Sequence, residues 1–138
     1  MIRIASLFLA ALVVGSQAQA QSPAPVTEAA IYFEPDSDGL TIAGFDIIDE
    51  WVGRFRTRIP PRLYIEGHTS TLGGDAHNVD LSWRRAMSVR DALVARGIAS
   101  SRIAVGAYGE TAPARWTVDG VHEPLNDRVV IRAPDSKP

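Results

Sequence analysis

The sequence has no cysteine, which excludes a disulfide framework and the thioether attachment that anchors bacterial lipoproteins. An excess of one charge is also absent: 14 Lys and Arg residues stand against 16 Asp and Glu residues, for a formal net charge of -2 at pH 7. This balance gives no electrostatic reason to expect nucleic acid or an anionic membrane as a partner. Lysine is nearly absent, since Lys137 is the only one.

Long hydrophobic runs are also rare. The apolar stretch from Ile4 to Val14 is shorter than the roughly 20 residues that a membrane-spanning helix needs. Arg3 precedes this stretch and Ala18-Gln19-Ala20 follows it, which is the order of a secretory signal peptide. We therefore expect residues 1–20 to be removed before Gln21, and the mature protein to be soluble outside the cytoplasm without a stable membrane anchor.

The rest of the chain predicts one domain. Residues 21–28 are small, polar and proline-containing, so they predict a flexible lead, followed by a domain over residues 29–134 and a tail over 135–138. Runs of apolar or alternating residues predict strands at 29–33, 62–66, 102–105 and 127–131.

Two segments have the three- and four-residue apolar spacing of helices with one buried face. The first begins near Leu40, with Thr41 as its expected N-cap, and ends before Pro60-Pro61. The second runs from an expected cap at Asp75 to about Arg96, with its inward side formed by Ala86, Val89, Leu93 and Met87. Aromatic residues are expected in the core or at its edge, namely Phe33, Trp51, Phe55 and Trp83.

The order of these elements predicts an α+β fold. Strands and helices alternate, and two strands joined by a long loop follow. The expected architecture is a two-layer α/β sandwich of βαβαββ type, with a mixed sheet and both helices on one face.

A series of short motifs carries the most specific signal. Gly67-His68-Thr69-Ser70 is followed by Gly73, Asn78, Leu81-Ser82 and Arg85-Ala86, and later by Gly106 to Glu110, Pro113 and Asn126 to Val129. Together they resemble the signature of the OmpA-like peptidoglycan-binding domain, which reads G-H-T-D, then G, N, L-S and R-A, and later N-R-R-V. The resemblance implies a non-catalytic periplasmic module, without cofactor or metal, that binds the diaminopimelate of the peptidoglycan stem peptide.

The resemblance also implies which residues contact the ligand. The acid of G-H-T-D and the arginine of R-A correspond to Ser70 and Arg85. A guanidinium holds a carboxylate through two parallel hydrogen bonds, whereas Ser70 offers only a neutral hydroxyl where an acid would pair with an ammonium. Arg85→Ala is accordingly expected to weaken binding more than stability. The alternative for Arg85 is a structural ion pair with Glu66 or Asp80.

Three further positions belong to the expected site. Thr69 and Asn78 match the pattern and either contact the ligand or tie the loop to the helix. Arg128 matches the second arginine of N-R-R-V, while Asp127 replaces the first and could form an internal ion pair instead. The candidate ligand-binding residues are thus Thr69, Ser70, Asn78, Arg85 and Arg128.

Two other functions stay open at this point. The same fold with a degenerate pocket would serve protein–protein contact in the cell envelope. An acid close to Ser70 and Arg85, such as Asp75 or Asp80, would favour ligand binding over this alternative. An envelope hydrolase would need a serine bonded to a base, and the sequence has no G-x-S-x-G turn. The three histidines lack the spacing of a metal site.

Overall fold

The computed structural model describes residues 28–134 as a four-stranded sheet covered by two helices. The predicted signal peptide at 1–20, nearly all of the predicted lead and the tail at 135–138 lie outside the described residues. No helix within the described part of the chain is long and apolar enough to span a bilayer.

The sheet is mixed, as predicted. Its strands are β1 (Glu28–Tyr32), β2 (Leu63–Gly67), β3 (Ile103–Ala107) and β4 (Arg128–Arg132), in the order β1-β4-β2-β3. β4 runs antiparallel to both β1 and β2, whereas β2 and β3 are parallel. The last strand in the sequence therefore lies in the middle of the sheet, and the segment just before β4 is brought beside the end of β2.

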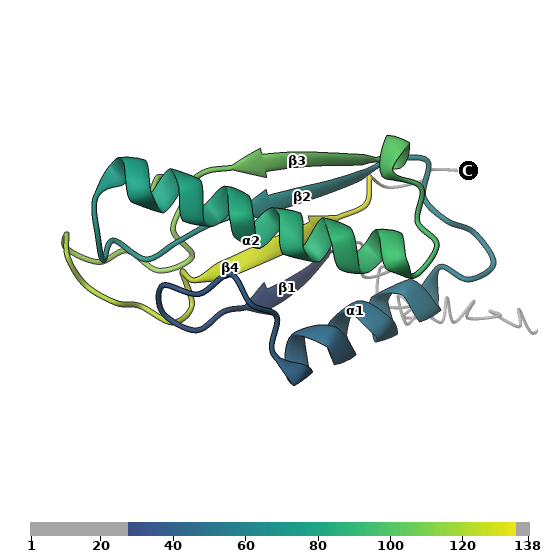
Figure 1. Cartoon of the computed structure of the whole chain (residues 1–138), viewed down its shortest axis with the longest axis horizontal. Helices are drawn as coiled ribbons and strands as arrows, with labels where there is room; N and C mark the ends of the chain where they lie inside the picture. Colours follow the sequence, from purple (N-terminus) through teal and green to yellow (C-terminus); the bar gives the residue numbers. More distant parts are fainter. Residues whose placement is uncertain (1–27, 135–138) are drawn as a thin grey trace, which may run out of the picture.

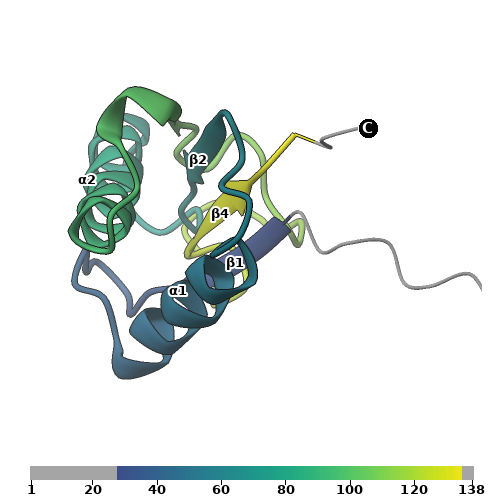
Figure 2. The same ribbon diagram turned by 90° about the vertical axis from the view of Figure 1, so that its right-hand side faces the viewer.

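Both helices lie on one face of the sheet, as Figures 1 and 2 show. The helix α1 (Ile42–Arg54) packs on β1, and the longer α2 (Asp75–Ala95) crosses β2, β3 and β4. A short 3₁₀ turn, η1 (Ser100–Arg102), leads into β3. These bounds confirm the predicted architecture and place the start of α2 next to the loop that follows β2.

The two predicted helix caps have different outcomes. The Thr41 hydroxyl accepts a hydrogen bond of 3.1 Å from the Gly44 N–H, which confirms the cap of α1. The predicted Asp75 cap is wrong: Gly74 is the extended N-cap residue, and Asp75 is the first helical residue. Its carboxylate is therefore in the first turn, where it still interacts favourably with the helix dipole.

The core lies between the helices and the sheet, and it contains Ala86, Val89 and Leu93 as predicted. Met87 is only partly buried and lies outside the core. Phe33 and Trp51 are buried and Phe55 packs against Trp51, whereas Trp83 is 46% exposed and belongs neither to the core nor to the residues packed against it. The reason is rotational, because the helix turns Trp83 toward solvent between the buried residues Ser82 and Arg85.

The close approach of β2 to α2 requires glycine at the last strand position. A Cβ placed on Gly67 would lie 1.9 Å from the carbonyl oxygen of Ser82, a distance that no side chain can occupy. Backbone pairing continues beyond the strand, where the His68 N–H donates to the Arg128 carbonyl at 2.9 Å. Gly67 thus lets the loop that carries Thr69 and Ser70 lie directly against the helix.

Candidate functional site

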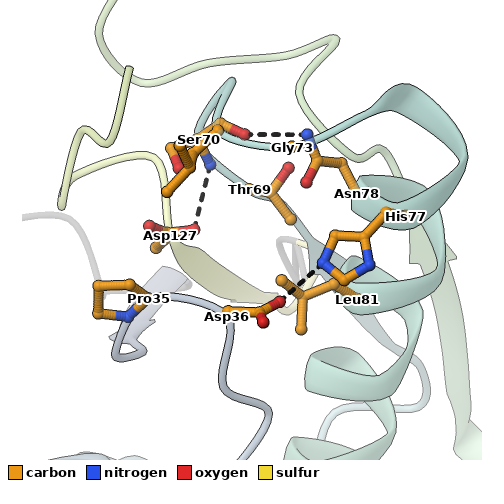
Figure 3. Close-up of a pocket in the computed structure, with 10 residues that line it drawn as sticks. Pro35, Asp36, Thr69, Ser70, Gly73, His77, Asn78, Leu81 and Asp127 are labelled. Carbon is orange, nitrogen blue, oxygen red and sulfur yellow. Dashed lines mark hydrogen bonds and ion pairs between the residues drawn. The ribbon is translucent and has the colours of Figure 1, made fainter. Parts of the chain in front are cut away.

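A pocket of about 270 Å³ opens where the loops after β1 and β2 meet the start of α2. Three of the five predicted site residues line it, namely Thr69, Ser70 and Asn78. Asp127 closes it from the segment before β4, as Figure 3 shows. Its volume lies just below the range of about 300–1,000 Å³ for ligand pockets, which suits one residue of a peptide better than a whole sugar–peptide unit.

Arg85 and Asp127 form a buried ion pair behind this pocket. Nη1 of Arg85 lies 2.6 Å from Oδ1 of Asp127, and the two side chains are 0% and 3% exposed. The internal ion pair considered for Asp127 is therefore present, and its partner is Arg85. Neither Glu66 nor Asp80 pairs with Arg85: Glu66 pairs with Arg132, and Asp80 pairs with Arg84 on the surface.

The remaining nitrogens of Arg85 bind backbone oxygens. Nε donates to the Ser37 carbonyl at 2.7 Å and Nη2 donates to the Glu34 carbonyl at 3.0 Å. Nη1 also donates to the His68 carbonyl at 3.2 Å. The guanidinium therefore joins the loops after β1 and β2 to the start of β4, and it does not line the pocket.

This environment changes what is expected of Arg85. Every nitrogen of the guanidinium donates to an oxygen of the protein, so a direct grip on a ligand carboxylate stays a prediction. Such a grip would require Arg85 to exchange at least one of these bonds. The expectation that its removal affects stability little no longer holds, because breaking a buried ion pair leaves an uncompensated charge.

Three polar atoms of the pocket residues have no hydrogen-bond partner in the described part of the chain. They are Oγ1 of Thr69, Oδ1 of Asn78 and Oδ2 of Asp127. Their residues are only 1–2% exposed. Because buried polar groups are almost always hydrogen-bonded, these three atoms are exceptions, although Oδ2 of Asp127 lies 3.0 Å from Nε2 of His122.

The orientation of the Asn78 amide follows from its partners. Its nitrogen donates to the Ser70 carbonyl at 3.3 Å and to Oε2 of Glu110 at 2.6 Å. Both partners are acceptors, so the nitrogen has to face them, and the oxygen is left without a partner. Asn78 therefore ties the loop to the helix and still leaves an acceptor free.

At the mouth of the pocket a histidine is hydrogen-bonded to an aspartate. Asp36, in the loop after β1, accepts from Nε2 of His77 on α2 at 2.7 Å, and Figure 3 shows this contact. Both side chains line the pocket, and both are largely exposed. Of the ten described residues that line the pocket, none is Lys or Arg. The walls therefore carry two carboxylates, from Asp36 and Asp127, and no permanently cationic side chain.

Arg128 is the predicted site residue that lies apart from the pocket. It is directly after Asp127 and begins β4, where its Cα is paired with that of Tyr32. Its Nη2 donates to the Ala112 carbonyl at 3.3 Å, and burial lowers the pKa of its guanidinium. Because side chains alternate along a strand, Arg128 faces away from the side on which Asp127 lies.

His68 is buried beside the pocket and stacks on Tyr108 with ring centroids 5.3 Å apart. Burial, together with the nearby Arg128 and Arg132, lowers the pKa of the imidazole to about 4. His68 is therefore neutral at physiological pH and adds no charge to the site.

The described residues do not support a hydrolytic site. The Ser82 hydroxyl donates to the Val79 carbonyl at 2.8 Å and accepts from the Gly109 N–H at 3.0 Å. No hydrogen bond joins a serine hydroxyl to a histidine nitrogen within residues 28–134, so the nucleophile–base contact that a hydrolase needs is not formed there.

Sequence reasoning did not assign Asp127 or Asp36 to the site. Asp127 had a usable signal, because it replaces the first arginine of the N-R-R-V pattern just as Ser70 replaces the acid of G-H-T-D. Relative to the pattern, position 70 loses a negative charge and position 127 gains one. These opposite changes indicate that one substitution compensates for the other. Asp36 had no such signal, since it occurs in a cluster of ordinary turn-forming residues.

Comparisons with known proteins agree with this fold. The model of the OmpA family matches residues 32–127. The peptidoglycan-binding protein ArfA of Mycobacterium tuberculosis is 34% identical over 106 residues, which cover 77% of this chain and 32% of ArfA. Outer membrane porin F of Pseudomonas fluorescens is 42% identical over 65 residues, which cover 47% of this chain and 20% of the porin.

The solved structures include the peptidoglycan-associated lipoprotein from Burkholderia pseudomallei. It superimposes with a TM-score of 0.68 at 21% identity and covers 76% of this chain and 89% of the lipoprotein chain. At this identity the match establishes a shared fold. The chain spans about a third or less of the length of ArfA and of porin F.

Proposed function

The chain belongs to the OmpA family, and on that premise we propose that its pocket binds the stem peptide of peptidoglycan, with diaminopimelate as the residue that enters. The module acts in the periplasm as a non-catalytic binding domain. The observation that carries the proposal is the cluster of unpartnered polar atoms on Thr69, Asn78 and Asp127 in a single pocket. The names of ArfA and of the Burkholderia lipoprotein agree with this ligand class.

The position of Asp127 favours ligand binding over a degenerate pocket. An acid near Ser70 and Arg85 is the feature that separates the two functions, and Asp127 provides it. Its Oδ1 accepts from the Ser70 N–H at 3.1 Å and from Nη1 of Arg85 at 2.6 Å. Asp80 does not provide it, because its carboxylate is on the surface and pairs with Arg84.

The predicted site residues have different roles under this proposal. Thr69, Ser70 and Asn78 line the pocket and contact the ligand. Arg85 positions Asp127 and the surrounding loops. A ligand contact by Arg128 requires a ligand that extends beyond the pocket toward the loop between β3 and β4.

A matched pair of threonine substitutions tests the proposal. The Thr69 hydroxyl has no partner in the described chain, so Thr69→Val should leave the free energy of unfolding unchanged or slightly higher. Binding of a tripeptide that ends in meso-diaminopimelate should weaken at least about fivefold, because one hydrogen bond to the ligand is lost. Thr41→Val removes a helix cap outside the pocket, so it should cost about 1 kcal/mol of stability and leave affinity unchanged.

Calorimetric titration and urea unfolding of both variants give the four values needed. Sedimentation with purified sacculi provides a second binding readout that uses the natural polymer. If the wild-type protein binds neither the tripeptide nor sacculi, the proposed function is wrong. If both variants bind like the wild type, the pocket at Thr69 is not the binding site.

A further inference from the structure

Two departures from the family pattern meet at one point of the structure. Ser70 stands where the pattern has an acid, and Asp127 stands where it has an arginine. Although 57 positions separate them, the Ser70 N–H donates to Oδ1 of Asp127 at 3.1 Å. The carboxylate of residue 127 therefore lies beside the backbone from which the family's acid would project, as Figure 3 shows.

The carboxylate of Asp127 is held in one orientation. Oδ1 accepts from both Arg85 and Ser70, and the side chain is 3% exposed. Oδ2 has no hydrogen-bond partner in the described chain. One oxygen is thus held by Arg85 and Ser70, while the second has no hydrogen bond and lies 3.0 Å from Nε2 of His122.

The other free atoms of the pocket also accept hydrogen bonds. Oδ1 of Asn78 is an acceptor only, and Oγ1 of Thr69 accepts through its lone pairs. With Oδ2 of Asp127, they make three acceptor atoms, and an ammonium group has three N–H donors. A carboxylate group of a ligand, in contrast, would place its own acceptor oxygens against these acceptor atoms.

The charges around the pocket also favour an ammonium group as the part of the ligand that enters. The pocket walls carry the carboxylates of Asp36 and Asp127 and no Lys or Arg among their described residues. His77 pairs with Asp36 at the mouth. Nε2 of His122 lies 3.0 Å from Oδ2 of Asp127, so a ligand that binds this oxygen has to share it with the His122 imidazole or displace the ring.

We propose that Asp127 supplies the carboxylate that receives the ammonium group of the ligand and so takes over, from its position beside the Ser70 backbone, the role that position 70 has lost. Asn78 and Thr69 complete the ammonium site, and Arg85 is a positioning residue that holds Asp127 in place. The proposal deepens the proposed function and rests on it.

The direct test is to move the carboxylate from position 127 back to position 70. The probe is a tripeptide ending in meso-diaminopimelate, titrated by calorimetry at about pH 8, where an imidazole is ordinarily neutral. Asp127→Asn should weaken binding at least tenfold, because a charged hydrogen bond becomes a neutral one. Ser70→Asp/Asp127→Asn, which moves the acid back to position 70, should recover most of the loss.

Two controls accompany these variants. Asp80→Asn removes a surface acid of α2 outside the pocket and should leave affinity unchanged. Ser70→Asp alone places a second carboxylate next to Asp127, so it should give no gain in affinity. Wild-type affinity in Asp127→Asn would overturn the inference and leave the proposed function standing, whereas a wild-type protein that binds neither tripeptide nor sacculi would overturn both.

A measurement on the wild-type protein covers the case in which Asp127→Asn fails to fold. The ¹³C resonance of the Asp127 carboxyl carbon should shift when the tripeptide saturates the protein. It should stay in place with the same tripeptide acetylated on the side-chain amine, which should also bind at least tenfold more weakly. An unmoved resonance at saturation, or equal affinity for the two tripeptides, would overturn the inference.

Discussion

The buried guanidinium of Arg85 gives the sharpest stability prediction. Arg85→Met keeps an extended side chain but removes every donor. Loss of one partner from a buried ion pair costs about 3–5 kcal/mol, and the carbonyls of Glu34, Ser37 and His68 also lose a donor. We expect the free energy of unfolding to fall by about 4 kcal/mol or more, a large part of the 5–15 kcal/mol that is typical of a domain.

The neighbouring Arg84 is a matched control. It forms two ion pairs, with Asp38 and Asp80, where Arg85 forms one, but its side chain is 43% exposed. Arg84→Met should therefore change stability little, since exposed ion pairs contribute little. Urea unfolding followed by far-UV circular dichroism measures both variants. If Arg85→Met costs no more than Arg84→Met, the account of Arg85 as the support for Asp127 and its loops is refuted.

Two further predictions concern the support of the site. Gly67→Ala should lower the free energy of unfolding by about 3 kcal/mol or more, because its Cβ would overlap the Ser82 carbonyl. Gly53→Ala has open space around it and should stabilise α1 by about 0.5–1 kcal/mol. Similar unfolding free energies for the two variants would contradict this prediction. Because the pKa of His68 is about 4 in the folded protein and about 6.5 in an unfolded chain, only the unfolded chain takes up this proton as the pH falls from 6.5 to 4. Stability should decline by up to about 3 kcal/mol over that window and by less in His68→Gln, and identical pH profiles of unfolding free energy would rule out this contribution.

The sequence was sufficient for the helices and strands of the fold because their signals are local. Apolar periodicity and turn residues placed every strand within about two residues of its observed bounds, and Thr41 was recognised as a cap. Errors occurred where neighbouring residues compete for one role. Gly74 rather than Asp75 is the N-cap of α2, and the rotation of α2 exposes Trp83.

The candidate site was only partly predictable from the sequence. Thr69, Ser70 and Asn78 lie on segments that follow each other closely, so their gathering around one pocket follows from the motif. Asp127 joins them only because β4 is inserted beside β2, a long-range pairing that no local pattern specifies. The same pairing buries Arg85 against Asp127, which replaces the expected ligand contact with an internal one.

Chemical-shift mapping with the meso-diaminopimelate tripeptide tests the central claim most directly. In ¹H–¹⁵N spectra of the protein, saturation should produce the largest shifts at the backbone amides of Thr69, Ser70, Asn78 and Asp127, which surround the pocket. The amide of Tyr64, on β2 and outside the pocket lining, should stay in place. Shifts that cluster away from the pocket, or spectra that do not change at millimolar tripeptide, would contradict the account.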